Sequence, residues 1–210
     1  MLKYFICFLI SIMPLNFLRI FFYNKILGYK INYESIVKFL TILISDNCEI
    51  ENSRLSSFMI IKIKKIKITN SKIKNFNIIK NFNLFEMHEN SCIGKFNRII
   101  GENKIKKDTS FIINKNVFIK NKNYIDLSDN VDIGEDVKIH SFCQLWTHGY
   151  TADRKLKIGS INIKKNCIIN SGCLISQGVT IGENAILDYG SITTSNLENN
   201  KFYYHELKKK

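Results

Sequence analysis

The sequence predicts an all-β fold, a solenoid of short parallel strands that follows an N-terminal hydrophobic helical segment. The first observation is a row of aliphatic residues six positions apart, and the second is a row of compact residues four positions after all of them except Leu145. A step of six fits neither the period of a helix nor the alternation of a single strand. It fits a chain that repeatedly makes a strand and a turn, so that each coil buries its apolar side chains by stacking on its neighbours. The aliphatic row is Leu127, Ile133, Ile139, Leu145, Ile163, Ile169, Ile175, Ile181 and Leu187, and the compact row is Val131, Val137, Cys143, Cys167, Cys173, Val179, Ala185 and Ser191.

The first 40 residues form the predicted hydrophobic helical segment. Its apolar run from Tyr4 to Leu15 is shorter than the roughly 20 residues that cross a bilayer. One interpretation is a helix pair that caps an end of the solenoid. The other is attachment of residues 1–30 to a membrane surface, because Arg19, Lys25 and Lys30 flank an aromatic cluster in the manner of interfacial anchors. A secretory signal is a weaker alternative because no small-x-small cleavage site follows.

The six-residue step also appears, with slips of one or two residues, between residues 44 and 126. This stretch is interpreted as earlier coils of the same solenoid, and a separate small β domain is the alternative. The expected organisation is therefore a repeat domain over 41–195 and a basic tail over 196–210 that ends in three lysines. Terminal segments of solenoids commonly differ from the repeats and act as caps.

Two segments, 131–137 with the sequence VDIGEDV and 179–185 with the sequence VTIGENA, resemble repeats of the hexapeptide-repeat acyltransferases. That family has a left-handed parallel β-helix, and the resemblance covers about residues 111–195. It is closest to the sugar O-acetyltransferase branch, which includes galactoside, maltose and nodulation-factor acetyltransferases. The resemblance implies acetyl-CoA as co-substrate and a homotrimer with its clefts between subunits.

The long insertion at 146–162 interrupts the repeats, and a loop of this length in a compact repeat fold usually has a function. In the resembling enzymes a loop at this place carries the catalytic histidine, which His148 matches. An imidazole with an ordinary pKa of about 6.5 accepts the proton of an attacking hydroxyl at neutral pH, so His148 is expected to act as general base. Trp146 and Tyr150 are predicted to contact the sugar. The loop has no cysteine and no nucleophile motif, which favours direct transfer without an acyl-enzyme.

The resemblance also implies where coenzyme A lies. Ser171 and Thr194 match a serine and a threonine of the family, and Gly190 and Ser191 match a turn of small residues. Tyr189 departs from this pattern, and the usual Gly-x-Pro-Ala/Cys-Arg ending is missing. The basic partners of the nucleotide phosphates are therefore sought elsewhere, with Lys164 and Lys165 as candidates by charge alone.

The implied function is transfer of an acetyl group from acetyl-CoA to a sugar hydroxyl, on a cell-surface polysaccharide or its precursor. Two alternatives keep the scaffold: an N-acetyltransferase for a nucleotide-linked amino sugar, and a non-catalytic β-helix that serves as a scaffold or binding protein. A metal site is not expected, because the close histidine pair of the β-helical carbonic anhydrases is missing, as His140 and His148 stand eight apart.

The composition bounds the partners and the compartment. The 31 basic and 18 acidic residues give a net charge of +13, which suits an anionic partner or follows simply from a Lys-, Asn- and Ile-rich composition. No recognised nucleic-acid motif accompanies the lysines, so no nucleic acid is expected. The six cysteines form no Cys-x-x-Cys pair, which disfavours a zinc ribbon and a disulfide framework. The predicted location is the cytoplasm, with association to the inner face of the cytoplasmic membrane.

Overall fold

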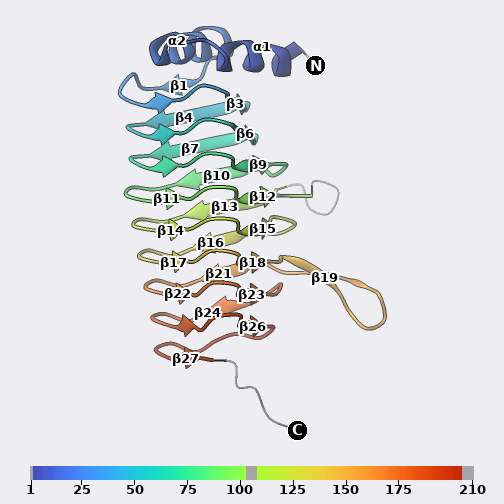
Figure 1. Cartoon of the computed structure of the whole chain (residues 1–210). Helices are drawn as coiled ribbons and strands as arrows, with labels where there is room; N and C mark the ends of the chain where they lie inside the picture. The colour runs from blue at the N-terminus through green and yellow to red at the C-terminus, as the bar shows by residue number, and fades with distance from the viewer. Residues whose placement is uncertain (1, 103–107, 205–210) are drawn as a thin grey trace.

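The computed structural model describes residues 2–102 and 108–204 and shows a prism of stacked coils (Figure 1). Each coil contributes one strand to each of three parallel sheets, and these contain eight, nine and eight strands. The predicted all-β parallel solenoid with an N-terminal helical segment is confirmed. The coils before residue 126 belong to the same sheets as the later ones, so the alternative of a separate small β domain is wrong.

The three faces of the prism are called sheet A, sheet B and sheet C. Sheet A consists of β1 (Lys30–Ile31), β4 (Asn47–Glu51), β7 (Lys65–Thr69), β10 (Leu84–Met87), β13 (Ser110–Ile113), β16 (Val131–Ile133), β21 (Ile161–Ile163) and β24 (Thr180–Ile181). Sheet B consists of β2 (Ile36–Val37), β5 (Arg54–Leu55), β8 (Lys72–Ile73), β11 (Cys92–Ile93), β14 (Phe118–Ile119), β17 (Lys138–Ile139), β22 (Ile168–Ile169), β25 (Ile186–Leu187) and β27 (Phe202–Tyr203). Sheet C consists of β3 (Thr41–Ile44), β6 (Met59–Lys62), β9 (Ile78–Lys80), β12 (Arg98–Ile100), β15 (Tyr124–Asp126), β18 (Gln144–Leu145), β23 (Leu174–Ile175) and β26 (Ile192–Thr193).

The interior is a single column of apolar side chains along the axis of the prism. Every residue of the aliphatic row predicted from the sequence is buried, and so is every residue of the compact row. Leu127 differs from its neighbours in the row in one respect. Sheet C pairs Leu145 with Ile125, so the inward strand position of that coil belongs to Ile125. Leu127 lies beyond β15, in the longer corner that leads to sheet A, and is buried there.

Buried side-chain amides link successive coils at the edge between sheets B and C. The Oδ1 atom of Asn77 accepts a hydrogen bond from the backbone N–H of Asn97 at 2.8 Å. Asn97 accepts from Asn123 at 2.9 Å, and Asn123 accepts from Cys143 at 2.7 Å. Corner N–H groups that the strand ladders do not use are satisfied in this way, as burial requires. The same position becomes Cys143 and then Cys173 in the later coils, where the thiols pack inside.

The N-terminal helices α1 (Leu2–Ser11) and α2 (Asn16–Leu27) cover the first coils and close one end of the solenoid (Figure 1). Cys7, Ile10 and Tyr23 are buried against the first strands, and the Tyr23 hydroxyl donates to the Thr41 carbonyl at 2.9 Å. Arg19 was expected to anchor the segment at a membrane surface, and this is wrong for the side chain. It is 5% exposed, and its Nε donates to the Val37 carbonyl at 2.7 Å.

Apolar side chains nevertheless remain exposed over both helices. They are Leu2, Tyr4, Phe5, Phe8, Leu9, Ile12, Leu15, Phe17, Phe21 and Ile26. The helices of the described chain are each too short, at 10 and 12 residues, to span a bilayer.

The strands extend past both ends of the repeat domain expected at 41–195. At the N-terminal end β1 and β2 already pair with later coils, and at the C-terminal end β27 pairs with β25. The division into a helical segment, a transferase domain and a basic tail stays a prediction. Residues 205–210, the end of that tail, lie outside the described residues.

Candidate functional site

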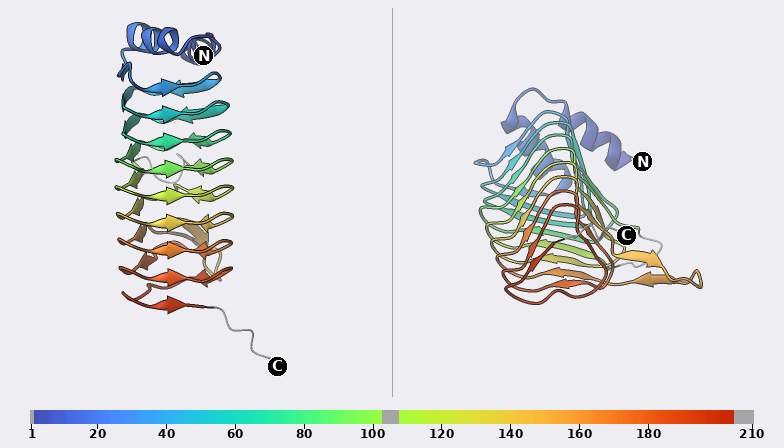
Figure 2. Two further views of the ribbon diagram at one scale, coloured as in Figure 1. Left: turned by 60° about the vertical axis from the view of Figure 1, so that its left-hand side comes forward. Right: turned by 60° about the horizontal axis from the view of Figure 1, so that its bottom comes forward.

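A β-hairpin protrudes from the edge between sheets C and A, at the insertion predicted from the sequence (Figure 2). Its strands are β19 (His148–Tyr150) and β20 (Leu156–Ile158), which pair antiparallel, with His148 opposite Ile158. The hairpin base is held to the solenoid by the Gly159 N–H, which donates to the Thr147 carbonyl at 2.9 Å. A Cβ atom on Gly159 would lie 2.7 Å from the backbone of Gly178 in the next coil, so only glycine allows this approach. The start of the hairpin is therefore fixed on the rigid solenoid.

His148 contacts a buried carboxylate. Its Nδ1 atom lies 2.8 Å from Oδ2 of Asp126, which ends strand β15 in the preceding coil. The Asp126 side chain is 4% exposed and the His148 side chain is 21% exposed. A carboxylate accepts hydrogen bonds and cannot donate them, so Nδ1 carries the imidazole proton and Nε2 is left with its lone pair. The pair is arranged as a base and the group that orients it.

Thr147 holds the same carboxylate from the adjacent position. Its hydroxyl donates to Oδ2 of Asp126 at 2.6 Å, and its backbone N–H donates to the same oxygen at 3.1 Å. The Thr147 hydroxyl in turn accepts from the backbone N–H of Asp129 at 2.9 Å. These donors stabilise the negative charge of a side chain that is buried, where an unpartnered charge would be costly.

Ser128 completes the hydrogen-bond network. Its hydroxyl donates to Oδ1 of Asp126 at 3.0 Å, and its oxygen lies 3.0 Å from Nδ1 of His148. The Nδ1 proton of His148 is thus shared between an Asp126 oxygen and the Ser128 oxygen. The imidazole is held from one side by two residues of a single corner, which limits the rotation of its ring.

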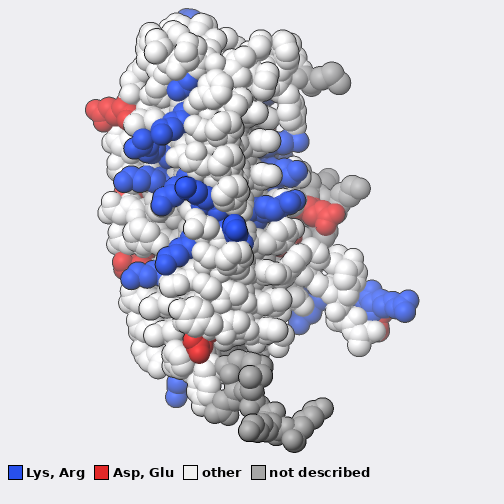
Figure 3. Space-filling view, in the orientation of Figure 1, with Lys and Arg blue, Asp and Glu red and all other residues white. Residues whose placement is uncertain are grey.

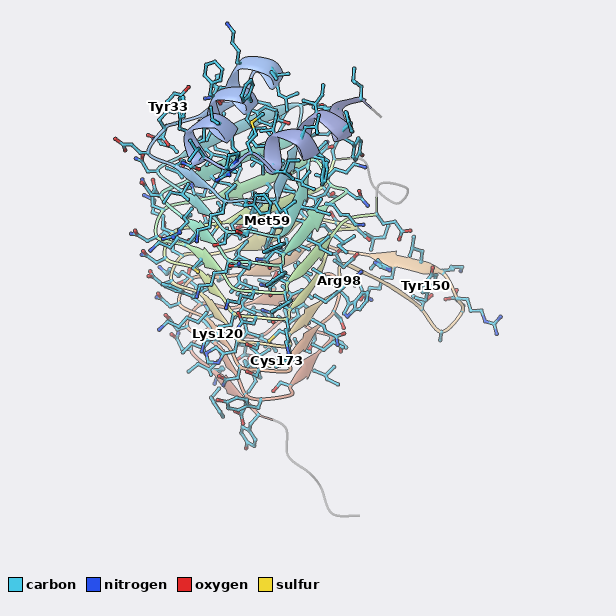
Figure 4. The ribbon with its side chains drawn as sticks, turned by 45° about the horizontal axis from the view of Figure 1, so that its top comes forward. Tyr33, Met59, Arg98, Lys120, Tyr150 and Cys173 are labelled. Atoms are coloured by element: carbon cyan, nitrogen blue, oxygen red, sulfur yellow. The ribbon has the colours of Figure 1, made fainter. Side chains whose placement is uncertain are left out.

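Trp146 and Tyr150, the predicted sugar contacts, both lie near His148 in the chain but in different surroundings. The Trp146 ring meets the imidazole edge to face, with centroids 5.9 Å apart, and stacks on Tyr124 at 4.8 Å. One face of the indole is therefore occupied by Tyr124. Tyr150 is 72% exposed on the hairpin, which extends away from the solenoid (Figure 4). Their contact with a sugar stays a prediction.

The residues expected to bind coenzyme A lie on three different edges of the prism. Ser171 and Gly190 stack on each other at the edge between sheets B and C, where the Gly190 N–H donates to the Ser171 carbonyl at 3.0 Å. Ser191 and Thr194 line one pocket of about 440 Å³ near the last coil. Lys164 and Lys165 follow β21 on the edge between sheets A and B, away from the hairpin edge, and Lys165 pairs with Glu183 at 3.4 Å. The structure thus brings the four small residues together on the last coils and leaves Lys164 and Lys165 on another edge.

The sequence analysis missed Asp126, Thr147 and Ser128 as partners of His148. The signal was the length of the coil. Sheet C pairs Tyr124 with Gln144 and Ile125 with Leu145, a separation of twenty residues. Counting back the same distance from His148 reaches Ser128, beside the carboxylate. Three steps of six make eighteen residues, so this coil is two residues longer than the regular step.

Within residues 2–102 and 108–204, no three His, Cys, Asp or Glu side chains are grouped as metal ligands. All six cysteines are unpaired. Five of them are buried, and burial raises the pKa of the Cys7 thiol to about 11. The site on the hairpin edge therefore consists of a carboxylate, an imidazole and two hydroxyl groups.

Comparisons with known proteins find distant similarity to several solved transferase structures. No protein-family model matches it, and no curated protein does. Among solved structures it is similar to a hexapeptide-repeat-containing acetyltransferase from Vibrio cholerae, with 13% identity over 97% of this chain and 84% of that chain and a TM-score of 0.43. It is also similar to the polySia specific acetyltransferase NeuO, with 15% identity, 85% and 82% coverage and a TM-score of 0.39. A third is the N-acyltransferase AntD from Bacillus cereus, in complex with dTDP and 3-hydroxybutyryl-CoA, with 14% identity, 86% and 81% coverage and a TM-score of 0.42.

Solved structures of the class predicted from the repeats are thus among those that the chain is similar to. The likenesses are distant, with identities of 13–15% and TM-scores of 0.39–0.43. The chemistry of this chain therefore has to come from its own side chains, above all from Asp126 and His148.

Proposed function

We propose that the protein is an acetyl-CoA-dependent O-acetyltransferase that modifies a sugar hydroxyl, with His148 as general base. The contact between Nδ1 of His148 and the buried Asp126 carboxylate, at 2.8 Å, carries this proposal. It fixes the tautomer in which Nε2 can accept a proton, and it supplies a negative charge for the imidazolium that forms when it does.

The reaction follows from these roles. The sugar hydroxyl attacks the thioester carbonyl carbon of acetyl-CoA while its proton moves to Nε2 of His148. The new C–O bond forms, the C–S bond breaks, and the imidazolium returns the proton to the leaving thiolate. The oxyanion of the tetrahedral intermediate would bind backbone N–H groups of an adjacent coil. Ser128 donates to Asp126 and lies beside the base, and we assign it to orienting the imidazole.

A hydroxyl acceptor is favoured over an amine by the contact between His148 and Asp126. A hydroxyl is a weak nucleophile until its proton is removed during the attack, and a histidine backed by a carboxylate meets that need. The acceptor in this proposal is a cell-surface polysaccharide or its precursor. Acetyl-CoA would bind along the later coils, with Ser171, Gly190, Ser191 and Thr194 as contacts of its arm and Lys164 and Lys165 as partners of its phosphates.

His148→Gln tests the proposal, because glutamine can keep a hydrogen bond to Asp126 but cannot accept the proton. With acetyl-CoA and a panel of sugars, release of the free thiol should fall by about 10² to 10⁴, or roughly 3–5 kcal/mol in the barrier. His88→Gln, just after β10 on sheet A and outside every proposed site, is the matched control and should keep the parental rate. If His148→Gln transfers acetyl groups as fast as the parent, the assigned role is wrong. Faster transfer to amino sugars than to hydroxyl acceptors would establish the N-acetyltransferase instead.

We further propose that α1 and α2 rest on the inner face of the cytoplasmic membrane and that the chain forms a homotrimer. Exposed aromatic side chains, such as Phe5 and Phe17 at 60% and 57%, support the first part, together with nearby Lys3 and Lys25. The double variant Phe5→Ser/Phe17→Ser leaves the buried contacts of the helices intact, and it should lose co-sedimentation with vesicles that contain anionic lipid. Unchanged co-sedimentation would refute membrane contact, and a monomeric mass in light scattering would refute the trimer.

A further inference from the structure

Charge is distributed unequally over the three faces of the solenoid. Sheet B presents its outward side chains in two columns that run along the axis, while the residues between them point inside and are buried. From β2 to β17 the outward positions are Ile36, Lys38, Arg54, Ser56, Lys72, Lys74, Cys92, Gly94, Phe118, Lys120, Lys138 and His140. We call this surface the cationic stripe. It carries lysine, arginine and histidine side chains and no carboxylate.

A lysine-rich composition alone does not explain the stripe, because sheet A carries both acidic and basic side chains. Sheet A carries outward carboxylates among its lysines, and Lys30 pairs with Glu49 across strands at 3.1 Å. Among the described residues, no cation of the stripe lies within 4.0 Å of a carboxylate. Figure 3 shows Lys and Arg side chains following one another down the solenoid, with few acidic side chains between them. Charges of one sign have thus gathered on this face without carboxylate partners among residues 2–102 and 108–204.

The stripe contains a hollow at its middle coils. Cys92 and Gly94 provide its floor, because one small side chain and one glycine lie between coils that carry lysines. Lys74 borders the hollow on one side, and Phe118 and Lys120 border it on the other. A Cβ atom at Gly94 would lie 2.5 Å from the Lys120 carbonyl oxygen, so the close stacking of the two coils requires glycine here. The floor of the hollow is therefore a consequence of backbone packing.

The pKa of His140 is lowered by its surroundings. It lines the same hollow as Lys120 and Lys138. Burial, and after it these two lysines, lower the pKa of His140 below its ordinary value. Like charges held this close repel one another, and a bound anion would relieve the repulsion. The hollow thus combines positive potential with an aromatic wall at Phe118, which is 46% exposed.

We propose that the cationic stripe binds a linear acidic glycan, whose negative groups contact the lysines while one sugar ring enters the hollow against Phe118. This rests on the proposed acetyl transfer to a sugar and names the class of acceptor as a carboxylate- or phosphate-bearing polysaccharide. Successive coils are about 4.8 Å apart, similar to the length of one sugar unit in an extended chain, so the spacing of the lysines suits such a polymer. Sugar rings pack their apolar faces on aromatic side chains.

The shape of the stripe favours a glycan over the other polyanions. Single-stranded nucleic acids bind to rows of aromatic side chains on which successive bases stack. The stripe offers one such side chain, Phe118. At the edge between sheets B and C, the Phe76 ring already stacks on Phe58 and on Phe96, so its two faces are not open to bases. A lipid surface is broad, whereas the stripe is two columns wide. The stripe also lies on the opposite side of the prism from the edge that carries the hairpin, and Figure 4 shows Lys120 and Tyr150 on opposite sides. Binding at the stripe can therefore be measured separately from the reaction at His148.

The test measures binding of a fluorescent oligogalacturonate to the full chain without acetyl-CoA, in the His148→Gln background. Lys74→Gln/Lys120→Gln removes two charges from the hollow. Lys65→Gln/Lys80→Gln, on sheets A and C, is the control with the same change of charge. Each lost contact should lower the slope of log affinity against log salt by about 1, so the stripe variant should differ from the parent by roughly 2 and the control should not.

Cys92→Phe separates a built hollow from general charge attraction, because it fills the hollow and leaves the charge unchanged. Its affinity for the oligogalacturonate should fall about tenfold or more, as expected for loss of a packed sugar ring. Circular dichroism and thermal melting verify that each variant folds. The proposal is overturned if the stripe and control variants bind equally, if Cys92→Phe binds like the parent, or if a neutral maltooligosaccharide binds as tightly. Tighter binding of single-stranded DNA also overturns it, and so does binding of anionic vesicles that Phe5→Ser/Phe17→Ser keeps and the stripe variant loses. If the parent chain does not bind the oligogalacturonate, the stripe proposal fails, while the proposed acetyl transfer is tested separately by the His148→Gln assay.

Discussion

Asp126→Asn is the most informative single change at the proposed site, because it keeps the shape of the side chain and removes its charge. Asp126 accepts hydrogen bonds from the Thr147 hydroxyl, the Thr147 backbone N–H, the Ser128 hydroxyl and the His148 ring. An asparagine has one accepting oxygen, and its NH₂ group would face a donor. The imidazole is then free to move its proton to Nε2, where it can no longer act as a base.

The expected magnitudes follow from these contacts. Loss of the base tautomer should lower kcat by about 10² to 10⁴, or roughly 3–5 kcal/mol. Hydrogen bonds to a charged acceptor stabilise the fold by about 1 kcal/mol more than neutral ones, so weakening all four should cost about 4 kcal/mol of unfolding free energy. The KM for acetyl-CoA should stay close to the parental value, because Asp126 is buried and contacts protein groups.

The assay is thiol release from acetyl-CoA with the best acceptor of a sugar panel, measured together with chemical denaturation. Asp132→Asn is the matched control, since Asp132 is an exposed aspartate on sheet A that accepts from Asn114 at 3.0 Å. A folded Asp126→Asn variant whose kcat stays within threefold of the parent would refute the orienting role of this carboxylate. An equal loss of kcat in Asp132→Asn would show that removal of any carboxylate from the solenoid lowers the rate.

Three further predictions concern the hairpin, the network and the cationic stripe. Gly159→Ala should displace the hairpin base, because the added Cβ would lie 2.7 Å from the Gly178 backbone. The kcat should then fall about tenfold, and a parental kcat would show that the hairpin tolerates the displacement. Thr147→Val removes a 2.6 Å hydrogen bond to Asp126 and leaves a buried N–H without its acceptor, so denaturation should show a loss of about 1–3 kcal/mol. The pKa of His140, lowered by burial and two nearby lysines, should lie below about 6.5 in an NMR titration and rise when the oligogalacturonate binds. Because the unfolded chain binds that proton more readily, His140 lowers stability as the pH falls through the range between its unfolded and folded pKa values, and His140→Gln should lose less stability there.

The sequence by itself determined the solenoid. A step of six residues leaves a chain few ways to bury Ile133 and Ile139 except by stacking coils, because each coil alone exposes its apolar side chains. The insertion at 146–162 was also visible, since the repeat resumes on the far side of it. His148 was found because it lies in this insertion and matches the loop of a resembling family.

Only the tertiary structure decided the partners of His148. Asp126 is twenty-two residues away in sequence, and its position beside the imidazole depends on a corner with two more residues than the regular repeat allows. Such an offset has little effect on the hydrophobic pattern, because Leu127 remains buried in the corner. The outward register of sheet B was likewise hidden, as its lysines are spread along the chain and become neighbours only when the coils stack. The hydrophobic pattern of the sequence predicts which side chains are buried. Which polar side chains come into contact depends on how the coils pair.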